Sequence, residues 1–106
     1  MRFDIKDDDF NAFLETYVVS RNPLRFKEIP AKEKRKYIML CMIIHHIDPM
    51  KMYHEFELND ILKPMVDDYV MIRRYLVDYG FLKRETDGSK YWVDCDVNKY
   101  LKYHSV

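Results

Sequence analysis

Hydrophobic and polar residues alternate along much of the chain with the period of an α-helix. A first helix is predicted over residues 8–19, because a run of aspartates precedes an apolar stripe at helical spacing. Carboxylates at a helix start accept hydrogen bonds from free amides and complement the helix dipole. A lone helix cannot keep such a stripe in water, so it packs on its own domain or on a second copy. The stripe consists of Phe10, Phe13, Leu14 and Tyr17.

The next segment changes from polar to almost wholly apolar. Residues 20–30 predict an irregular, basic connection, because Pro23 and Pro30 restrict the residues before them to extended geometry. Pro30 also suits the first turn of a second helix, predicted over residues 31–47. This helix opens with basic residues and is then apolar on most sides, which is typical of a central, buried helix.

Three shorter elements are predicted in the following segment. A small strand is expected near residues 54–56, and a helix over residues 57–63 ends at Pro64. Asp67 or Asp68 caps a further helix that runs through Tyr79, and Gly80 is its expected left-handed stop. The inner face of this helix is predicted to comprise Tyr69, Ile72, Leu76 and Tyr79. Arg74 points outward and Arg73 lies at the boundary.

The pair Asp87-Gly88 predicts a β-hairpin with a two-residue turn, in which both central residues adopt positive φ. With that turn, the facing pairs are Leu82 with Val93, Lys83 with Trp92, Arg84 with Tyr91, Glu85 with Lys90 and Thr86 with Ser89. The segment after the hairpin could form one or two helical turns.

The order of these elements predicts a fold class that is mainly α with a small β-hairpin, namely a winged helix-turn-helix with an extra N-terminal helix. A chain of 106 residues suits a single domain. Residues 1–29 would form the N-terminal helix and the basic connection, residues 30–93 the winged-helix unit, and residues 94–106 a C-terminal tail or short helix.

Composition narrows the function classes. The 48% of hydrophobic and 34% of charged residues are ordinary for a globular protein, and the net charge is zero. The whole chain therefore does not favour nucleic acid, because phosphate neutralisation supplies most of the affinity. Positive charge is concentrated in residues 21–36. The longest uncharged run, residues 37–47, is about half the length of a membrane span. Two cysteines without an export signal predict a cytoplasmic protein with reduced thiols.

Several short motifs carry a resemblance to a known family. They are Pro30 with its basic followers, Asp67-Asp68-Tyr69, Arg73-Arg74, residues 76–80, Leu82, Arg84 and Tyr91-Trp92. Through them, residues 24–93 resemble a bacterial domain family of unknown function that occurs alone or at the C-terminus of ArsR-like transcriptional regulators. The resemblance implies a winged-helix-like fold and a link to transcription regulation, and no established chemistry.

The first hypothesis for function is weak or assembly-dependent DNA binding by a winged-helix protein of the transcription-regulator type. Outward groups of the helix ending at Tyr79 would face the major groove, and cations on the wing would reach phosphates. The alternative for the arginines is pairing with neighbouring carboxylates on a solvated face. The alternative for the basic residues at the start of the second helix is that they form a solvated helix end. The candidate nucleic-acid-binding residues are Arg73, Arg74, Lys83, Arg84, Lys90, Lys34 and Lys36.

The alternative function is a protein–protein interaction or dimerisation module on the same scaffold, without DNA binding. Its surface would be the stripe of Phe10, Phe13, Leu14 and Tyr17. Candidate partners are therefore DNA, a second copy or a regulator protein, and not a membrane. Cys41 and His45 share a helix face, but structural zinc needs four ligands, so no metal or cofactor is expected. The chain lacks a nucleophile elbow, a phosphate loop and a zinc-hydrolase motif, and we do not expect an enzyme.

Overall fold

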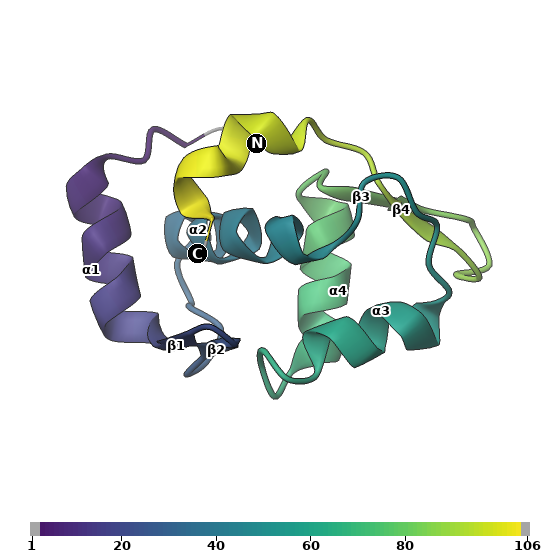
Figure 1. Ribbon diagram of the computed structural model, residues 1–106, viewed down its shortest axis with the longest axis horizontal. Coiled ribbons are helices and arrows are strands. Elements are labelled where there is room, and N and C mark those ends of the chain that lie inside the picture. Colours follow the sequence, from purple (N-terminus) through teal and green to yellow (C-terminus); the bar gives the residue numbers. More distant parts are fainter. Residues whose placement is uncertain (1–2, 105–106) are drawn as a thin grey trace.

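One apolar helix, α2 (Glu33–Ile43), lies at the centre of the molecule, as Figure 1 shows. The computed structural model describes residues 3–104. Helix α2 is buried continuously from Tyr37 and continues into a 3₁₀ turn, Ile44–His46. The central, buried helix predicted from the sequence is confirmed, but it is shorter at both ends than residues 31–47. Its charged first turn remains outside the core, because ionic side chains are costly to bury unpaired.

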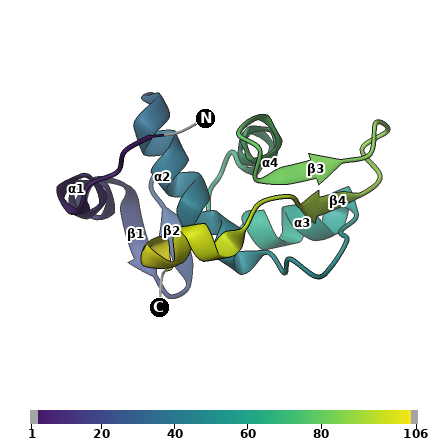
Figure 2. The same cartoon turned by 90° about the horizontal axis from the view of Figure 1, so that it is seen from above.

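Helix α1 (Asp7–Tyr17) and the hairpin that follows it form one end of the molecule, as Figure 2 shows. The predicted first helix over residues 8–19 ends early, because Val18 and Val19 enter strand β1 (Val18–Arg21). Strand β1 pairs antiparallel with β2 (Leu24–Phe26). The irregular connection predicted over residues 20–30 is therefore wrong. β-Branched residues favour strands, and the buried side chains of β2 fix this hairpin on the core.

Helices α3 (Glu55–Leu62) and α4 (Tyr69–Asp78) form the other end. The small strand predicted near residues 54–56 is reduced to an isolated bridge between Tyr53 and Tyr91, because α3 begins at Glu55. The predicted helix over residues 57–63 thus starts two residues earlier. Residue His54 precedes the helix, and its N–H donates to Oε1 of Glu57 at 2.8 Å, which satisfies an amide before the first turn.

The second hairpin pairs β3 (Leu82–Arg84) with β4 (Tyr91–Val93). Its register is confirmed at all three strand pairs, Leu82 with Val93, Lys83 with Trp92 and Arg84 with Tyr91. The predicted two-residue turn is wrong in detail, because Gly88 adopts a φ of 75° and no described non-glycine residue has a positive φ. The Gly88 N–H closes the turn on the Glu85 carbonyl at 2.9 Å. The Asp87 carboxylate accepts from the Ser89 N–H, also at 2.9 Å, and stabilises this longer loop.

A 3₁₀ segment, Val97–Tyr103, passes beside α2 and returns the chain towards α1 (Figures 1 and 2). The short C-terminal helix predicted from the sequence is thus present. Tyr103 is buried, and its ring lies edge-on to Phe10 of α1 with centroids 5.1 Å apart. The described chain measures 39 × 25 × 25 Å. No helix within residues 3–104 has both the length and the apolar character to span a membrane.

Candidate nucleic-acid interface

The cap and the apolar positions of α4 determine which of its arginines face the solvent. Asp68 caps the helix by accepting from the Met71 N–H at 3.3 Å, which confirms one of the two predicted caps. Ile72 and Leu76 are buried, and Arg74 and Asp78 are exposed on the outer face. Gly80 has a φ of 83°, the left-handed stop predicted after this helix. The predicted inner face of α4 is therefore confirmed at Ile72 and Leu76, and the outward position predicted for Arg74 is also confirmed.

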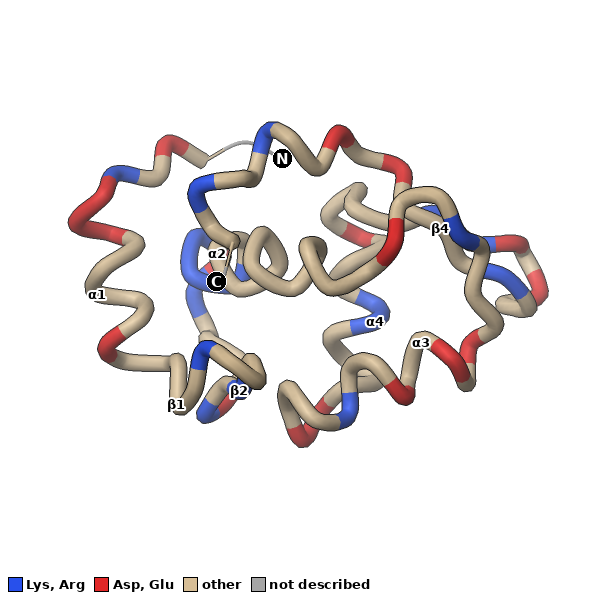
Figure 3. The backbone as a smooth tube through the Cα atoms, viewed as in Figure 1, with Lys and Arg blue, Asp and Glu red and all other residues tan. Residues whose placement is uncertain are grey.

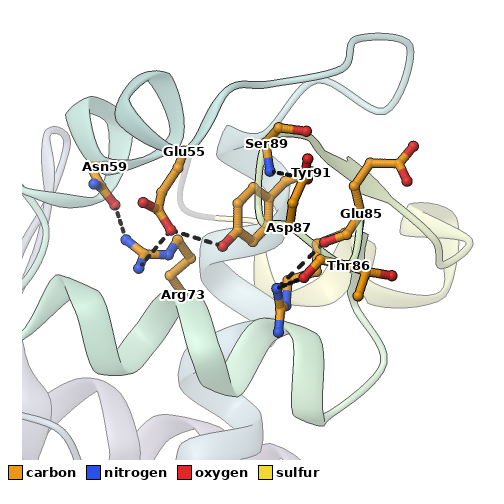
Figure 4. Close-up of polar contacts among 9 residues, drawn as sticks. Glu55, Asn59, Arg73, Glu85, Thr86, Asp87, Ser89 and Tyr91 are labelled. Carbon is orange, nitrogen blue, oxygen red and sulfur yellow. Dashed lines mark hydrogen bonds and ion pairs between the residues drawn. The ribbon is translucent and has the colours of Figure 1, made fainter.

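Arg73 connects three elements, as Figure 4 shows. Its Nη2 lies 3.1 Å from Oε1 of Glu55, and its Nη1 donates to Oδ1 of Asn59, both on α3. The Tyr91 hydroxyl of β4 donates to the same Glu55 oxygen at 3.2 Å. The Arg73 side chain is only 12% exposed. A guanidinium held in this way positions α3, α4 and the hairpin, and is not available as a free phosphate ligand.

One nitrogen of this guanidinium has no polar partner. Arg73 Nε is buried without a hydrogen bond, the only such side-chain atom recorded among the described residues. The guanidinium carbon lies 5.9 Å from the centroid of the Tyr91 ring. An arginine over an aromatic ring is attracted by the negative face of the ring, which offsets part of the cost of the unpaired N–H.

A polar pocket of about 410 Å³ opens beside Arg73. Its charged lining comprises Arg73, Arg74, Arg84, Glu55 and Asp78. Three cations and two carboxylates give this lining a formal charge of +1. The pocket thus brings together the three arginines of the predicted site, from α4 and β3. Arginine presents a planar fork of donors that matches a phosphate or a carboxylate.

The cationic side chains of α4 and the second hairpin differ in the ion pairs and hydrogen bonds that they make. Arg74 makes no ion pair or hydrogen bond through its side chain to any described residue. Arg84 contacts the carbonyls of Glu85 and Thr86 at 3.4 Å, which is long for a hydrogen bond. Lys83 pairs with Asp94 at 3.7 Å with both side chains exposed, and such pairs contribute little stability. Lys90 is exposed and is without an ion pair to the described residues. Arg74, Arg84 and Lys90 are therefore the freest of the predicted ligands.

The basic side chains at the start of α2 contact two different helices. Lys34 forms an ion pair with Asp9 of α1 at 2.9 Å. Lys36 lies 4.8 Å above the Tyr75 ring of α4 and also pairs with Glu33 at 3.7 Å. Figure 3 shows this cluster of basic residues at the start of α2, and acidic residues along α1 and α3. Lys36 is consequently on the α4 side of the molecule, whereas Lys34 faces α1.

The apolar stripe of α1 packs largely on its own domain. Phe13 is 2% exposed, and its ring centroid lies 5.3 Å from that of Tyr17 and 6.1 Å from that of Phe26. Phe10 and Leu14 are partly buried against the core. Because these contacts cover Phe13, it cannot serve as the centre of a contact surface in this conformation. Any contact through the stripe would use the exposed parts of its other members.

Sequence reasoning missed Glu55 and Asn59 as partners of Arg73. The signal was their spacing, since residues four apart share one face of a helix. The predicted strand over residues 54–56 removed Glu55 from the helix and hid that relationship. Cys41 is buried in the core, and His45 Nε2 lies 2.5 Å from the Tyr100 carbonyl oxygen. No group of three or more His, Cys, Asp or Glu side chains placed to hold a metal ion is found among residues 3–104.

These features define a small, mainly helical domain with two β-hairpins and an arginine-lined pocket between α4 and the second hairpin. A family model described as an uncharacterized protein conserved in bacteria (DUF2087) matches residues 25–93. The chain belongs to this family. The sequence-based resemblance to a bacterial family of unknown function is therefore confirmed, and the link to ArsR-like regulators stays a prediction. No curated protein and no solved structure matches the chain.

Proposed function

We propose that this protein binds DNA weakly, or within a larger assembly, as a winged-helix protein of the transcription-regulator type. In this proposal α2, α3 and α4 form the three-helix unit, and β3–β4 is the wing. The outer face of α4 lies in the major groove, as the second helix of a helix-turn-helix does. The resemblance to a family whose domains also occur at the C-terminus of ArsR-like regulators supports a link to transcription regulation by analogy alone.

The observation that carries the proposal is the pocket shared by Arg74 and Arg84. Arg74 is exposed and unpaired among the described residues, so it can reach a guanine edge or a phosphate without breaking an internal contact. Arg84 and Lys90 lie on the wing, where they would contact the phosphate backbone. Lys36 flanks α4 beside Tyr75 and is the further cation on this side.

Acidic groups limit the strength of this binding. Asp78 lies on the same face of α4 as Arg74, and Glu55 lines the same pocket. A nearby phosphate would be repelled by Asp78, whereas Glu55 is compensated by Arg73. With a net charge of zero for the chain, we expect few phosphate contacts and weak binding that disappears at moderate salt.

The test is a fluorescence-anisotropy titration of a labelled random duplex of about 25 base pairs at 50, 100 and 200 mM salt. Three phosphate contacts predict a loss of affinity of roughly 40-fold between the lowest and highest salt. Arg74→Gln, Arg84→Gln and Lys90→Gln should each weaken binding and reduce the salt slope by about 1. Lys99→Gln, which removes an exposed cation from the C-terminal segment, is the matched control and should change nothing.

Two results would contradict the proposal. One is the absence of binding at 50 mM salt with the protein in the high micromolar range. The other is an equal loss in Lys99→Gln and in the three site variants, which would indicate a general charge effect.

A second candidate function, a protein-interaction module without DNA binding, is favoured by exposed apolar side chains at the start of α3 and in the segment before it. Met50 is 91% exposed, Phe56 65% and Met52 52%. Large apolar side chains that gather on a surface often mark an interaction site. Sedimentation velocity with the wild type and with Phe56→Glu tests this candidate. Self-association that is lost in the variant, together with no DNA affinity, would favour it over DNA binding.

A further inference from the structure

A second pocket, of about 270 Å³, lies between α1 and the first turns of α2. It is separate from the arginine pocket and shares no lining residue with it. Lys32, Lys34 and Arg35 supply its cations, and Ala12 and the half-buried Tyr17 supply its accessible apolar surface. The pocket therefore has a positively charged wall beside an apolar wall.

The charge of this pocket selects an anion. Asp9 is its single carboxylate and is already paired with Lys34 at 2.9 Å. The side chains of Lys32 and Arg35 make no ion pair or hydrogen bond with any residue in the described part of the chain. With three cations and one carboxylate, the lining has a formal charge of +2. An anionic group can bind Arg35 and Lys32 without displacing an existing partner.

The other lining residues determine the size and polarity of the uncharged part of the ligand. The half-buried ring of Tyr17 offers an apolar surface, and the small side chain of Ala12 leaves space at the pocket wall. The Thr16 hydroxyl adds one hydrogen-bonding group. Pockets that bind small molecules combine such apolar walls with a few polar groups, and their volumes start near 300 Å³. The space suits a single ring and no more.

We propose that the cleft between α1 and α2 binds a small organic carboxylate with an apolar body of about one ring. The carboxylate pairs with Arg35 and Lys32, because a guanidinium and a carboxylate form charge-assisted hydrogen bonds. The ring of the ligand lies against Tyr17 and Ala12. Helix α1 precedes the family-matched residues 25–93, so this site joins a segment outside the match to the helix at the centre of the domain.

The proposal is tested with the full chain by following backbone amide signals in NMR titrations. The probes are benzoate, benzyl alcohol, which keeps the ring and lacks the charge, and inorganic phosphate, which has charge and no ring. We expect saturable shifts with benzoate at residues of α1 and the start of α2, with a dissociation constant on the order of 1–10 mM. Benzyl alcohol and phosphate should each bind at least about tenfold more weakly, because each lacks one half of the interaction.

Two variants separate charge from shape. Arg35→Gln should raise the dissociation constant for benzoate about tenfold, through loss of the charge-assisted pair. Ala12→Leu should raise it by a similar factor without changing the charge, because the larger side chain fills the cleft. Lys27→Gln, which removes an exposed cation that does not line this pocket, should leave it unchanged within about twofold.

Three results would overturn the proposal. They are the absence of saturation with benzoate up to 50 mM probe (about fivefold above the weakest expected constant), binding of phosphate as tight as that of benzoate, or unchanged benzoate binding in Ala12→Leu. None of them depends on whether the protein binds DNA, because Arg74, Arg84 and Lys90 are not part of this cleft.

Discussion

Arg73 of α4 holds Glu55 at the first position of α3, with 3.1 Å between Nη2 and Oε1. The two side chains differ in exposure, since Arg73 is 12% exposed and Glu55 is 49% exposed. The Tyr91 hydroxyl reaches the same carboxylate oxygen, so the pair also anchors the second hairpin. Arg73 is therefore a positioning residue of the α4 surface.

Arg73→Met should lower the free energy of unfolding by about 2 kcal/mol. Removing one partner of a buried ion pair costs more than this, but Glu55 can regain water on its exposed side. Urea unfolding followed by circular dichroism measures the effect. The matched control is Arg74→Met in the next position of the same helix, which should change the stability by no more than about 0.5 kcal/mol.

The two arginines should also differ in their effect on DNA. Arg74→Gln reduces the salt slope of binding, whereas Arg73→Met leaves the slope unchanged in protein that remains folded. Equal unfolding midpoints for Arg73→Met and Arg74→Met would contradict the positioning role. So would a reduced salt slope in Arg73→Met.

Features of this interface that depend on residues close in sequence could be predicted, whereas features that depend on contacts between distant segments could not. The register of β3–β4 agrees with the prediction made from the local sequence around Asp87-Gly88, although the loop is longer than the predicted two residues. The burial and pairing of Arg73 depend on Asn59 and Glu55, which belong to another helix. A helical wheel places Arg73 at a boundary and cannot tell which element covers that boundary.

The first hairpin escaped prediction for a related reason. Strands β1 and β2 have four and three residues, too few for alternation to stand out. Their position is fixed by distant contacts, since the Phe26 N–H donates to the Met65 carbonyl at 2.7 Å. Arg25 similarly reaches Asp67 at 2.5 Å, although Asp67 looked like a cap from its place before α4. Tertiary contacts decide these short segments.

Phe13→Ala should destabilise the protein by about 3–4 kcal/mol, because it leaves a cavity beside Phe26. Phe13 is the residue of α1 that is almost fully buried. Urea unfolding measures the loss. Val19→Ala, at a residue that is 67% exposed, is the control and should change the stability by less than about 0.5 kcal/mol. A loss below 1 kcal/mol in Phe13→Ala would show that α1 contributes little to the core.

His46 should make the protein less stable as the pH falls from 7 to 5. Partial burial and the neighbouring His104 and His45 lower the pKa of His46. The unfolded chain, with an ordinary histidine pKa near 6.5, then binds more protons than the folded chain, so stability rises with pH in this window. The measurements are urea midpoints at pH 7, 6 and 5 for the wild type and His46→Gln. The variant should lose less stability on acidification.

The carboxylates with shifted pKa values titrate mainly below the range of pH 5 to 7. Asp9, Glu57 and Asp87 have pKa values lowered by hydrogen bonds, so their stabilisation is lost only as the pH falls below the ordinary carboxyl range. An NMR titration of the His46 ring provides an independent check. A pKa at or above 6.5 would contradict the prediction.

Both cysteines should be slow to react in the folded protein. Burial raises the pKa of Cys95 to about 11 and raises that of the fully buried Cys41 further. The thiolate is the reactive species, so at pH 8 roughly one Cys95 in a thousand is reactive, compared with about a tenth of thiols with an ordinary pKa of 9.0. A colorimetric disulfide reagent should therefore modify Cys95 roughly 100-fold faster in denaturant than in buffer. In Cys95→Ser, the remaining thiol Cys41 should react only as fast as the core opens, and stabilising salts should slow it. Rapid modification of the folded variant at pH 8 would show that α2 is more accessible than its burial indicates.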